Sequence, residues 1–304
     1  MASRSDTLST LRRYEDPEAG LFEEFAERRL GPGGAFALLA GPLRERRALA
    51  WAICPTVGPE QGNLRRLEAL VARRLAGSGF EVVRIRPDVH PLHGEISLAT
   101  RLTELGEAVE LLRSRGAGNV GLVGTLFGGT VAALAAERLG SPTLALIEPA
   151  VRGRRYAREL LRREAVAQLM GDEEGDADGP KRELAATGRA TIRGLQLTTE
   201  AYDAISAVDL TEDLQAFAGS SLLVGISPSG ETPTALGKLR DRLGDLGGDV
   251  TVAGIADPLY APLGEYYYRD AGLLRLDTRL ELDRKIADAV AGWALDVNLA
   301  AASS

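Results

Sequence analysis

Short, nearly continuous apolar runs alternate with amphipathic helical patterns along most of the 304-residue chain. Such runs are typical of strands that helices cover on both faces of a parallel sheet. The alternation predicts an α/β fold built on a doubly wound, mostly parallel sheet. The expected strands are 47–54, 80–86, 119–124, 143–149, 220–227 and 249–256.

Three of the connecting segments carry clear apolar stripes. In each, leucines, valines or isoleucines recur at spacings of three and four, as they do on the buried face of a helix. The stripes are Leu64, Leu67, Leu70 and Val71; then Leu98, Leu102, Leu105, Val109 and Leu112; and finally Ile286, Val290, Trp293 and Val297.

Residues 151–219 interrupt the alternation with two or three helical patterns and no clear strand. The charged loop 171–182 lacks the ligand spacing of an EF-hand, so a solvated loop is the better account. We expect a helical cap here, inserted over the carboxyl edge of the sheet. The other expected parts are a flexible N-terminal segment at 1–20 and an α/β core formed by 21–150 and 220–304.

Charge and cysteine content limit the function classes. The formal net charge of −7 argues against a protein that binds nucleic acids or membrane surfaces. The first twenty residues have no apolar signal core, and no window approaches eighteen apolar residues. The one cysteine, Cys54, forms no disulfide within the chain, which fits a reducing compartment. A cytoplasmic protein is expected.

Three stretches, in order, resemble the α/β-hydrolase superfamily, in particular its serine-aminopeptidase-like group, which includes hydrolases associated with exosortase systems. They are 53–88, 120–140 and 146–164, within a resemblance that covers roughly residues 20–298. They resemble the oxyanion loop with its flanking strands, the nucleophile elbow with its helix, and the strand exit into the cap. The resemblance implies the α/β-hydrolase fold with a helical cap.

The elbow segment GTLFGGT, residues 124–130, departs from the G-x-S-x-G pattern in which the Ser is the nucleophile. Gly124, Gly128 and Gly129 supply the small residues that let the helix approach the strand. Leu126 stands at the position of the nucleophile. Positive φ at that position is unfavourable for a branched side chain.

The other two triad positions also differ from the family pattern. No His follows residue 93, so none lies after the last strand, where the resemblance places the base. Glu231 lies about where the acid would be, without a His to orient. The first hypothesis is therefore a non-catalytic α/β-hydrolase-fold protein, a pseudohydrolase that binds a small apolar ligand or a protein partner.

The second hypothesis is a rebuilt site for acyl transfer or for ester, thioester or amide hydrolysis. Cys54 follows a strand and could be a nucleophile if its pKa were lowered. His93 or His90, with Asp88 or Glu231, would complete the site. The alternative reading of Cys54 is a small buried apolar side chain.

Other chemistry is weakly signalled. Strand alternation points the Thr125 side chain away from the site. HPLHG, residues 90–94, carries two imidazoles without a second ligand cluster, so no metal or cofactor is expected. The elbow glycines lack the Lys of a P-loop, so nucleotide binding is disfavoured. A cyclase or lyase would need only acid–base groups, such as Asp88, Asp257 or a histidine.

What remains at the expected site is a mostly apolar pocket. The floor would be Leu126, Phe127 and the loop Pro55–Thr56–Val57, and the walls would be Tyr156, Asp257, Tyr260 and 266–268. Such a pocket suits a small molecule, although the same side chains could simply pack the cap onto the sheet. The basic stretch 152–164 could attract an anionic ligand or an acidic partner, or form a solvated helix face. A homodimer is also compatible with the sequence.

Overall fold

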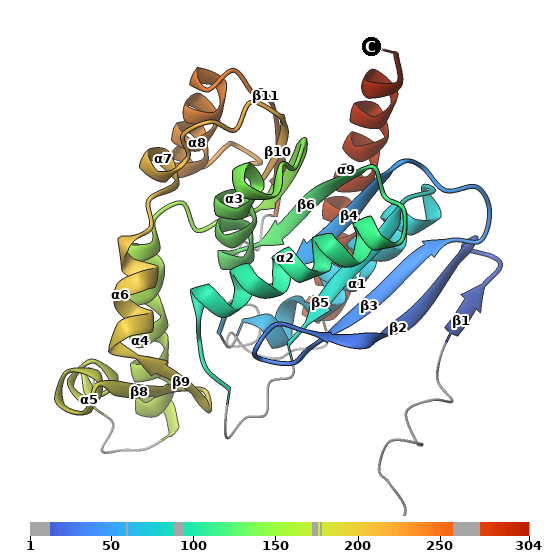
Figure 1. Cartoon of the computed structure of the whole chain (residues 1–304). Coiled ribbons are helices and arrows are strands. Elements are labelled where there is room, and N and C mark those ends of the chain that lie inside the picture. Colours follow the sequence, from blue (N-terminus) through green and yellow to red (C-terminus); the bar gives the residue numbers. More distant parts are fainter. Residues whose placement is uncertain are drawn as a thin grey trace, which may run out of the picture.

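The computed structural model describes residues 13–58, 60–87, 94–171, 176, 178–257 and 274–303. Within them the chain alternates strands and helices as the apolar runs predict (Figure 1). The elements are β1 (Arg13–Asp16), β2 (Leu21–Leu30), β3 (Ala35–Pro42), β4 (Leu49–Cys54), α1 (Gln61–Gly77), β5 (Glu81–Arg86), α2 (Leu98–Ser114), β6 (Asn119–Thr125), α3 (Phe127–Leu139), β7 (Thr143–Ile147), α4 (Gly153–Gly171), α5 (Gly179–Thr187), β8 (Arg189–Ile192), β9 (Leu195–Thr198), α6 (Thr199–Ala207), α7 (Leu210–Asp213), β10 (Ser220–Ser227), α8 (Thr234–Asp245), β11 (Asp249–Ala256) and α9 (Leu274–Ser303).

The described strands form a nine-stranded main sheet in the order β1-β2-β3-β5-β4-β6-β7-β10-β11. Neighbours from β5 to β11 pair in parallel, and β1, β2 and β3 add an antiparallel edge. All six expected strands are present. The expected doubly wound, mostly parallel sheet is therefore confirmed.

Helices cover both faces of this sheet. Helices α1 and α9 pack on one face, where Leu64, Leu67 and Val71 meet Ile286 and Val290. Helices α2, α3 and α8 pack on the other face. Each apolar stripe that the sequence shows is buried or packs against a buried cluster. Burial of these side chains is the main favourable contribution to folding.

The N-terminal strands differ from the sequence-based expectation. The pattern predicts no strand before residue 47 and a flexible segment at 1–20, yet Arg13–Asp16 form β1. Residues 1–12 lie outside the described residues. Strand β2 carries a run of charges that hides its alternation. Its Glu23 pairs with Arg73 of α1, and its Glu24 pairs with Arg115, which follows α2.

The inserted segment also contains strand structure. Between β7 and β10 the described chain forms α4 to α7 together with the hairpin β8–β9, so the expectation of no clear strand there is wrong. The hairpin strands have four residues each and turn at Arg193 and Gly194, both at positive φ. Strands this short give little period-2 signal. Backbone hydrogen bonds between Gln196 and residues 94–96 hold the hairpin beside the entry to α2.

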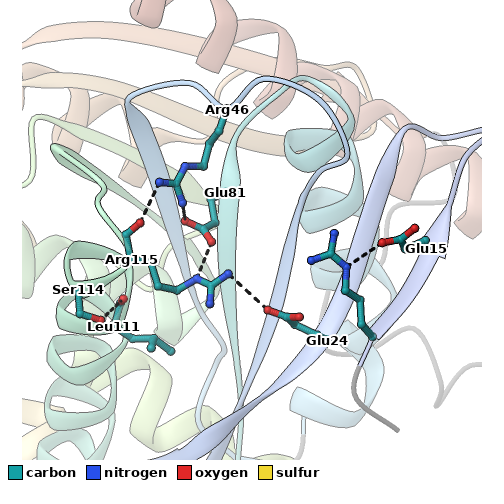
Figure 2. Close-up of polar contacts among 8 residues, drawn as sticks. Glu15, Glu24, Arg46, Glu81, Leu111, Ser114 and Arg115 are labelled. Carbon is teal, nitrogen blue, oxygen red and sulfur yellow. Dashed lines mark hydrogen bonds and ion pairs between the residues drawn. The ribbon is translucent and has the colours of Figure 1, made fainter.

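A buried carboxylate at the start of β5 is bonded to the segment before β4 and to the residue after α2 (Figure 2). Glu81, the first residue of β5, is 2% exposed and accepts from Arg46 Nη1 at 2.5 Å and Arg115 Nε at 2.6 Å. Arg115 follows α2 and also reaches Glu24 of β2 at 3.4 Å. One carboxylate therefore joins β2, β5, the segment before β4 and the end of α2.

We expect Glu81→Gln to lower the free energy of unfolding by about 2 kcal/mol, because two charge-assisted hydrogen bonds are weakened while the arginines regain water. Urea denaturation at neutral pH measures the change. Glu110→Gln is the matched control, since Glu110 pairs with Arg113 on the surface at 2.8 Å, and its loss should cost less than about 0.5 kcal/mol. Equal effects of the two variants would contradict the role assigned to Glu81.

Candidate functional site

The carboxyl ends of the parallel strands meet at one edge, where ligands bind in open α/β sheets. Cys54 ends β4, Leu126 follows β6, Glu148 follows β7, and Asp257 follows β11. Backbone pairs bring these ends into register, with Cys54 opposite Gly124 and Thr125 opposite Ile147. Helix α4 and the hairpin β8–β9 lie over this edge through contacts with residues 57 and 94–96.

Close approach of α3 to its neighbours determines the turn after β6. A Cβ on Gly124 would lie 2.3 Å from the carbonyl oxygen of Gly128, and one on Gly128 would lie 2.5 Å from the carbonyl oxygens of Cys54 and Pro55. Real side chains do not tolerate such distances, so only glycine fits at either position. The expectation that these glycines let the helix approach is confirmed.

Leu126 has a strained backbone, with φ of 47° and ψ of −122°. Its N–H donates to the Ile147 carbonyl at 2.9 Å, and its own carbonyl accepts from Gly129 at 3.0 Å and Ala150 at 3.3 Å. Bonds on both sides therefore hold an otherwise unfavourable conformation in place. The half-buried side chain packs against the cluster on the α1 and α9 face.

Cys54 is buried and unsuited to attack. It is 0% exposed, its Sγ lies 3.7 Å from the Pro55 carbonyl oxygen, and burial raises the pKa of the thiol far above its usual range. A thiol that stays protonated is a poor nucleophile. The structure thus places Cys54 where the small apolar reading expects it.

The other proposed catalytic residues are not brought together in the described part of the chain. Asp88, His90 and His93 lie outside the described residues, as do Tyr260 and 266–268. Glu231 is exposed in the segment after β10, where its carbonyl accepts from the Ser227 hydroxyl at 2.9 Å. The buried Thr125 hydroxyl donates to Glu68 of α1 at 2.8 Å, which agrees with the expected direction away from the site.

Tyr156 of α4 closes over the elbow. Its ring stacks on Phe127 with centroids 4.8 Å apart, and its hydroxyl donates to the Val57 carbonyl at 2.5 Å. The same hydroxyl lies 3.3 Å from Glu60 Oε2, and Arg163 donates to Glu60 Oε1 at 2.9 Å. Burial raises the pKa of Glu60 and of the Tyr156 hydroxyl. Phe127 and Tyr156 thus pack α4 against the first turn of α3.

A polar cavity lies beside the loop after β4. It has a volume of 280 Å³, and its lining includes Val57, Gly58, Leu195 and the ion-paired Arg101 and Glu104 of α2. Burial raises the pKa of Glu104 to about 7. The described residues contain no cluster of three His, Cys, Asp or Glu suited to a metal ion.

Glu148 is the residue at this edge that the sequence pattern missed. It has φ of 48°, its N–H donates to the Val224 carbonyl at 2.9 Å, and its Oε1 accepts from the Ile226 N–H at 3.0 Å. Burial raises its pKa to about 7. A carboxylate after the apolar run TLALI and before Pro149 was the available signal.

Comparison with known proteins places the fold. No family model matches the chain, and no curated protein matches it. Among solved structures, Est1E from Butyrivibrio proteoclasticus is 16% identical over 91% of this chain and 99% of its own, with a TM-score of 0.55. A Pyrobaculum calidifontis esterase is 19% identical over 90% and 86%, with a TM-score of 0.54.

These similarities and the sheet order give the chain the α/β-hydrolase fold. At such low identity they concern the fold alone, since one fold hosts many functions. No helix in the described part of the chain is long and apolar enough to cross a membrane.

We expect Cys54 to resist iodoacetamide in the folded protein at pH 8 and to react fully in denaturant, because the thiol is buried with a raised pKa. Mass spectrometry of the intact chain measures the modification. Free cysteine in the same mixture controls for reagent activity. Rapid labelling of the native chain would instead show a reactive thiol.

The raised pKa of Glu148 predicts a pH dependence of stability. Its folded pKa of about 7 lies above the unfolded value of 4.5, so this contribution is fully present below pH 4.5 and is lost as pH rises toward 7. The loss is about 3 kcal/mol. Glu148→Gln keeps the acceptor for Ile226 and should remove this dependence, so that the variant is the more stable form above pH 7.

Urea denaturation of both proteins between pH 4.5 and 8 measures this difference, and the contribution of Glu104 cancels because both proteins contain it. Parallel pH profiles for the two proteins would contradict the raised pKa.

Proposed function

We propose that this chain is a non-catalytic α/β-hydrolase-fold protein, a pseudohydrolase, which binds a small apolar ligand or a protein partner. The observation that carries this proposal is Leu126 at the strained turn between β6 and α3. The fold can present a nucleophile there, but a leucine side chain has no lone pair with which to attack. The elbow therefore keeps its backbone geometry without its reactive group.

The remaining groups support the same conclusion. Cys54 is buried with a raised pKa, so it does not replace the missing nucleophile. No His follows residue 93, so the position after the last strand, where hydrolases of this fold have their catalytic base, has no histidine. Tyr156 covers Phe127, so a ligand at the elbow would have to share space with helix α4.

Finer assignments belong to the same proposal. The resemblance of the stretches 53–88, 120–140 and 146–164 supports a relation to the serine-aminopeptidase-like group, which includes hydrolases associated with exosortase systems. We treat residues 151–219 as a cap on a core of 21–150 and 220–304. The single cysteine supports a cytoplasmic location.

A second candidate function is a proton-transfer reaction, such as that of a lyase or cyclase. Glu148 favours it, because a general acid or base works best when its pKa lies near the working pH. Its strained backbone next to the elbow is also typical of functional positions. The pH profile of Glu148→Gln tests the property on which this candidate depends.

We expect the purified protein to hydrolyse p-nitrophenyl acetate, p-nitrophenyl butyrate and the corresponding thioesters no faster than the protein-free buffer. Cys54→Ala and His93→Ala should leave that background unchanged. Release of nitrophenolate or thiol, followed by absorbance, measures the rate. Saturable hydrolysis that disappears in either variant would overturn the pseudohydrolase and support the rebuilt site with Cys54, His93 and Asp88 or Glu231.

A further inference from the structure

A second hollow lies on the inserted segment, away from the elbow. It has a volume of about 860 Å³ and lies among α4, α5, α6, α7 and the amino-terminal part of α8. Figure 1 shows α4 beside α6, with α7 and α8 beyond one end of the pair. Apolar and hydroxyl side chains line part of it, among them Leu161, Tyr202, Thr211 and Thr234. We call this hollow the cap groove.

Cations dominate the cap groove. Arg152 is paired with Asp209, and Arg162 with Glu159. Five other cations that line the groove form no ion pair with a carboxylate of the described residues: Arg154, Arg155, Arg158, Lys181 and Lys238. Against them the described lining has only the carboxylates Glu159 and Asp178. On a chain of net charge −7, this is a local reversal of sign.

Two of these arginines lie at a helix end that already carries partial positive charge. Arg154 and Arg155 lie in the first turn of α4, which contains no acidic residue. The amino end of a helix carries partial positive charge, so cations there destabilise the free helix and an anion would stabilise it. Thr234 and Ala235 bring the first turn of α8, also without an acidic residue, to the same groove.

The charges are spread along a line. Arg154, Arg158 and Arg162 recur at i+4 on the exposed face of α4 and span about 12 Å. The same stripe continues into two exposed apolar residues, Val166 at 41% and Leu169 at 45% exposure. A single phosphate or carboxylate would engage one end of this row. An extended segment that combines acidic and apolar side chains would cover all of it.

We propose that the cap groove and the exposed stripe of α4 bind an acidic polypeptide segment of a partner protein. Carboxylates of the partner pair with Arg154, Arg155 and Arg158, while apolar side chains cover Val166 and Leu169. Guanidinium forks suit carboxylates through paired hydrogen bonds. A short acidic segment experiences mainly the groove, because charges are screened within about 10 Å, whereas a long nucleic acid would also meet the net negative chain.

This proposal rests on one part of the proposed function, the binding of a protein partner, and adds the place and chemistry of that binding. The groove is formed by the inserted segment and by α8 without any residue of the elbow. A hydrolytic elbow and an acidic partner could therefore coexist. Failure of the binding experiment below would leave the ester hydrolysis result unchanged, and the reverse also holds.

The test uses a fluorescein-labelled oligoglutamate peptide of about twelve residues, long enough to span the arginine row. Fluorescence anisotropy measures binding to the full chain at about 0.05 M and 0.3 M salt. We expect saturable binding that weakens with salt. The variant Arg154→Glu/Arg158→Glu should weaken it by about tenfold or more.

The matched control is Arg138→Glu/Arg284→Glu, which makes the same charge change at two exposed arginines on α3 and α9. It should keep the affinity within about twofold of the parent chain. Thermal unfolding of every variant checks folding, and Arg158→Ala provides a milder substitution. Equal losses in both double variants, or no binding at low salt, would overturn the proposal.

Two further binding experiments distinguish a partly apolar acidic polypeptide from a purely acidic one and from a nucleic acid. Leucines introduced into the peptide should tighten binding by about fivefold, and Val166→Ser/Leu169→Ser should remove only that gain. A gain that persists in this variant would overturn the apolar part of the proposal. Tighter binding of single-stranded DNA with the same number of charges would overturn the choice of a polypeptide and assign the groove to nucleic acid.

Discussion

The close approach of the first turn of α3 to β6 and to the loop after β4 is the constraint on which this edge of the structure depends. Gly124 and Gly128 permit it, because neither position has room for a Cβ. Once the helix is that close, the residue between strand and helix must take positive φ. Leu126 does so, held by backbone hydrogen bonds with Ile147 and Ala150, at and just after the end of β7, and with Gly129 of α3. Packing alone therefore accounts for the turn, and no catalytic role of residue 126 is needed to explain it.

The same approach places Phe127 where α4 can cover it. Tyr156 stacks on that ring and donates to the Val57 carbonyl, and Arg163, about two turns further along α4, pairs with Glu60. These contacts join the inserted segment to the loop after β4. Through these contacts the inserted segment packs onto the sheet. The cap groove involves other side chains of α4 and does not take part in this packing.

Much of the fold could be predicted because the parallel strands are buried on both faces and read as apolar runs. Gly124 and Gly128 can also be predicted from the sequence, because the close contact between strand and helix requires glycine at those two positions. The antiparallel edge was missed because the charges of β2 are matched by distant arginines such as Arg73 and Arg115. The hairpin β8–β9 was missed because its strands are short.

The candidate site was less predictable, since it depends on where side chains end in space. Glu148 has no motif; only burial and the nearby Ile226 N–H give it an unusual pKa. Likewise, the sequence shows Cys54 at a strand end but not that its thiol is covered. The sequence places Tyr156 in a pocket wall; its stacking on Phe127 depends on how α4 packs against α3, which no local pattern encodes.

The Tyr156 contact also has a kinetic consequence. A molecule can reach the face of Phe127 only after the stacked ring moves aside and its hydroxyl releases Val57. Arrival at that surface would thus follow an opening step of the protein itself. The observed association rate should then level off at high ligand concentration, at the rate of opening, whatever the affinity of the molecule that enters.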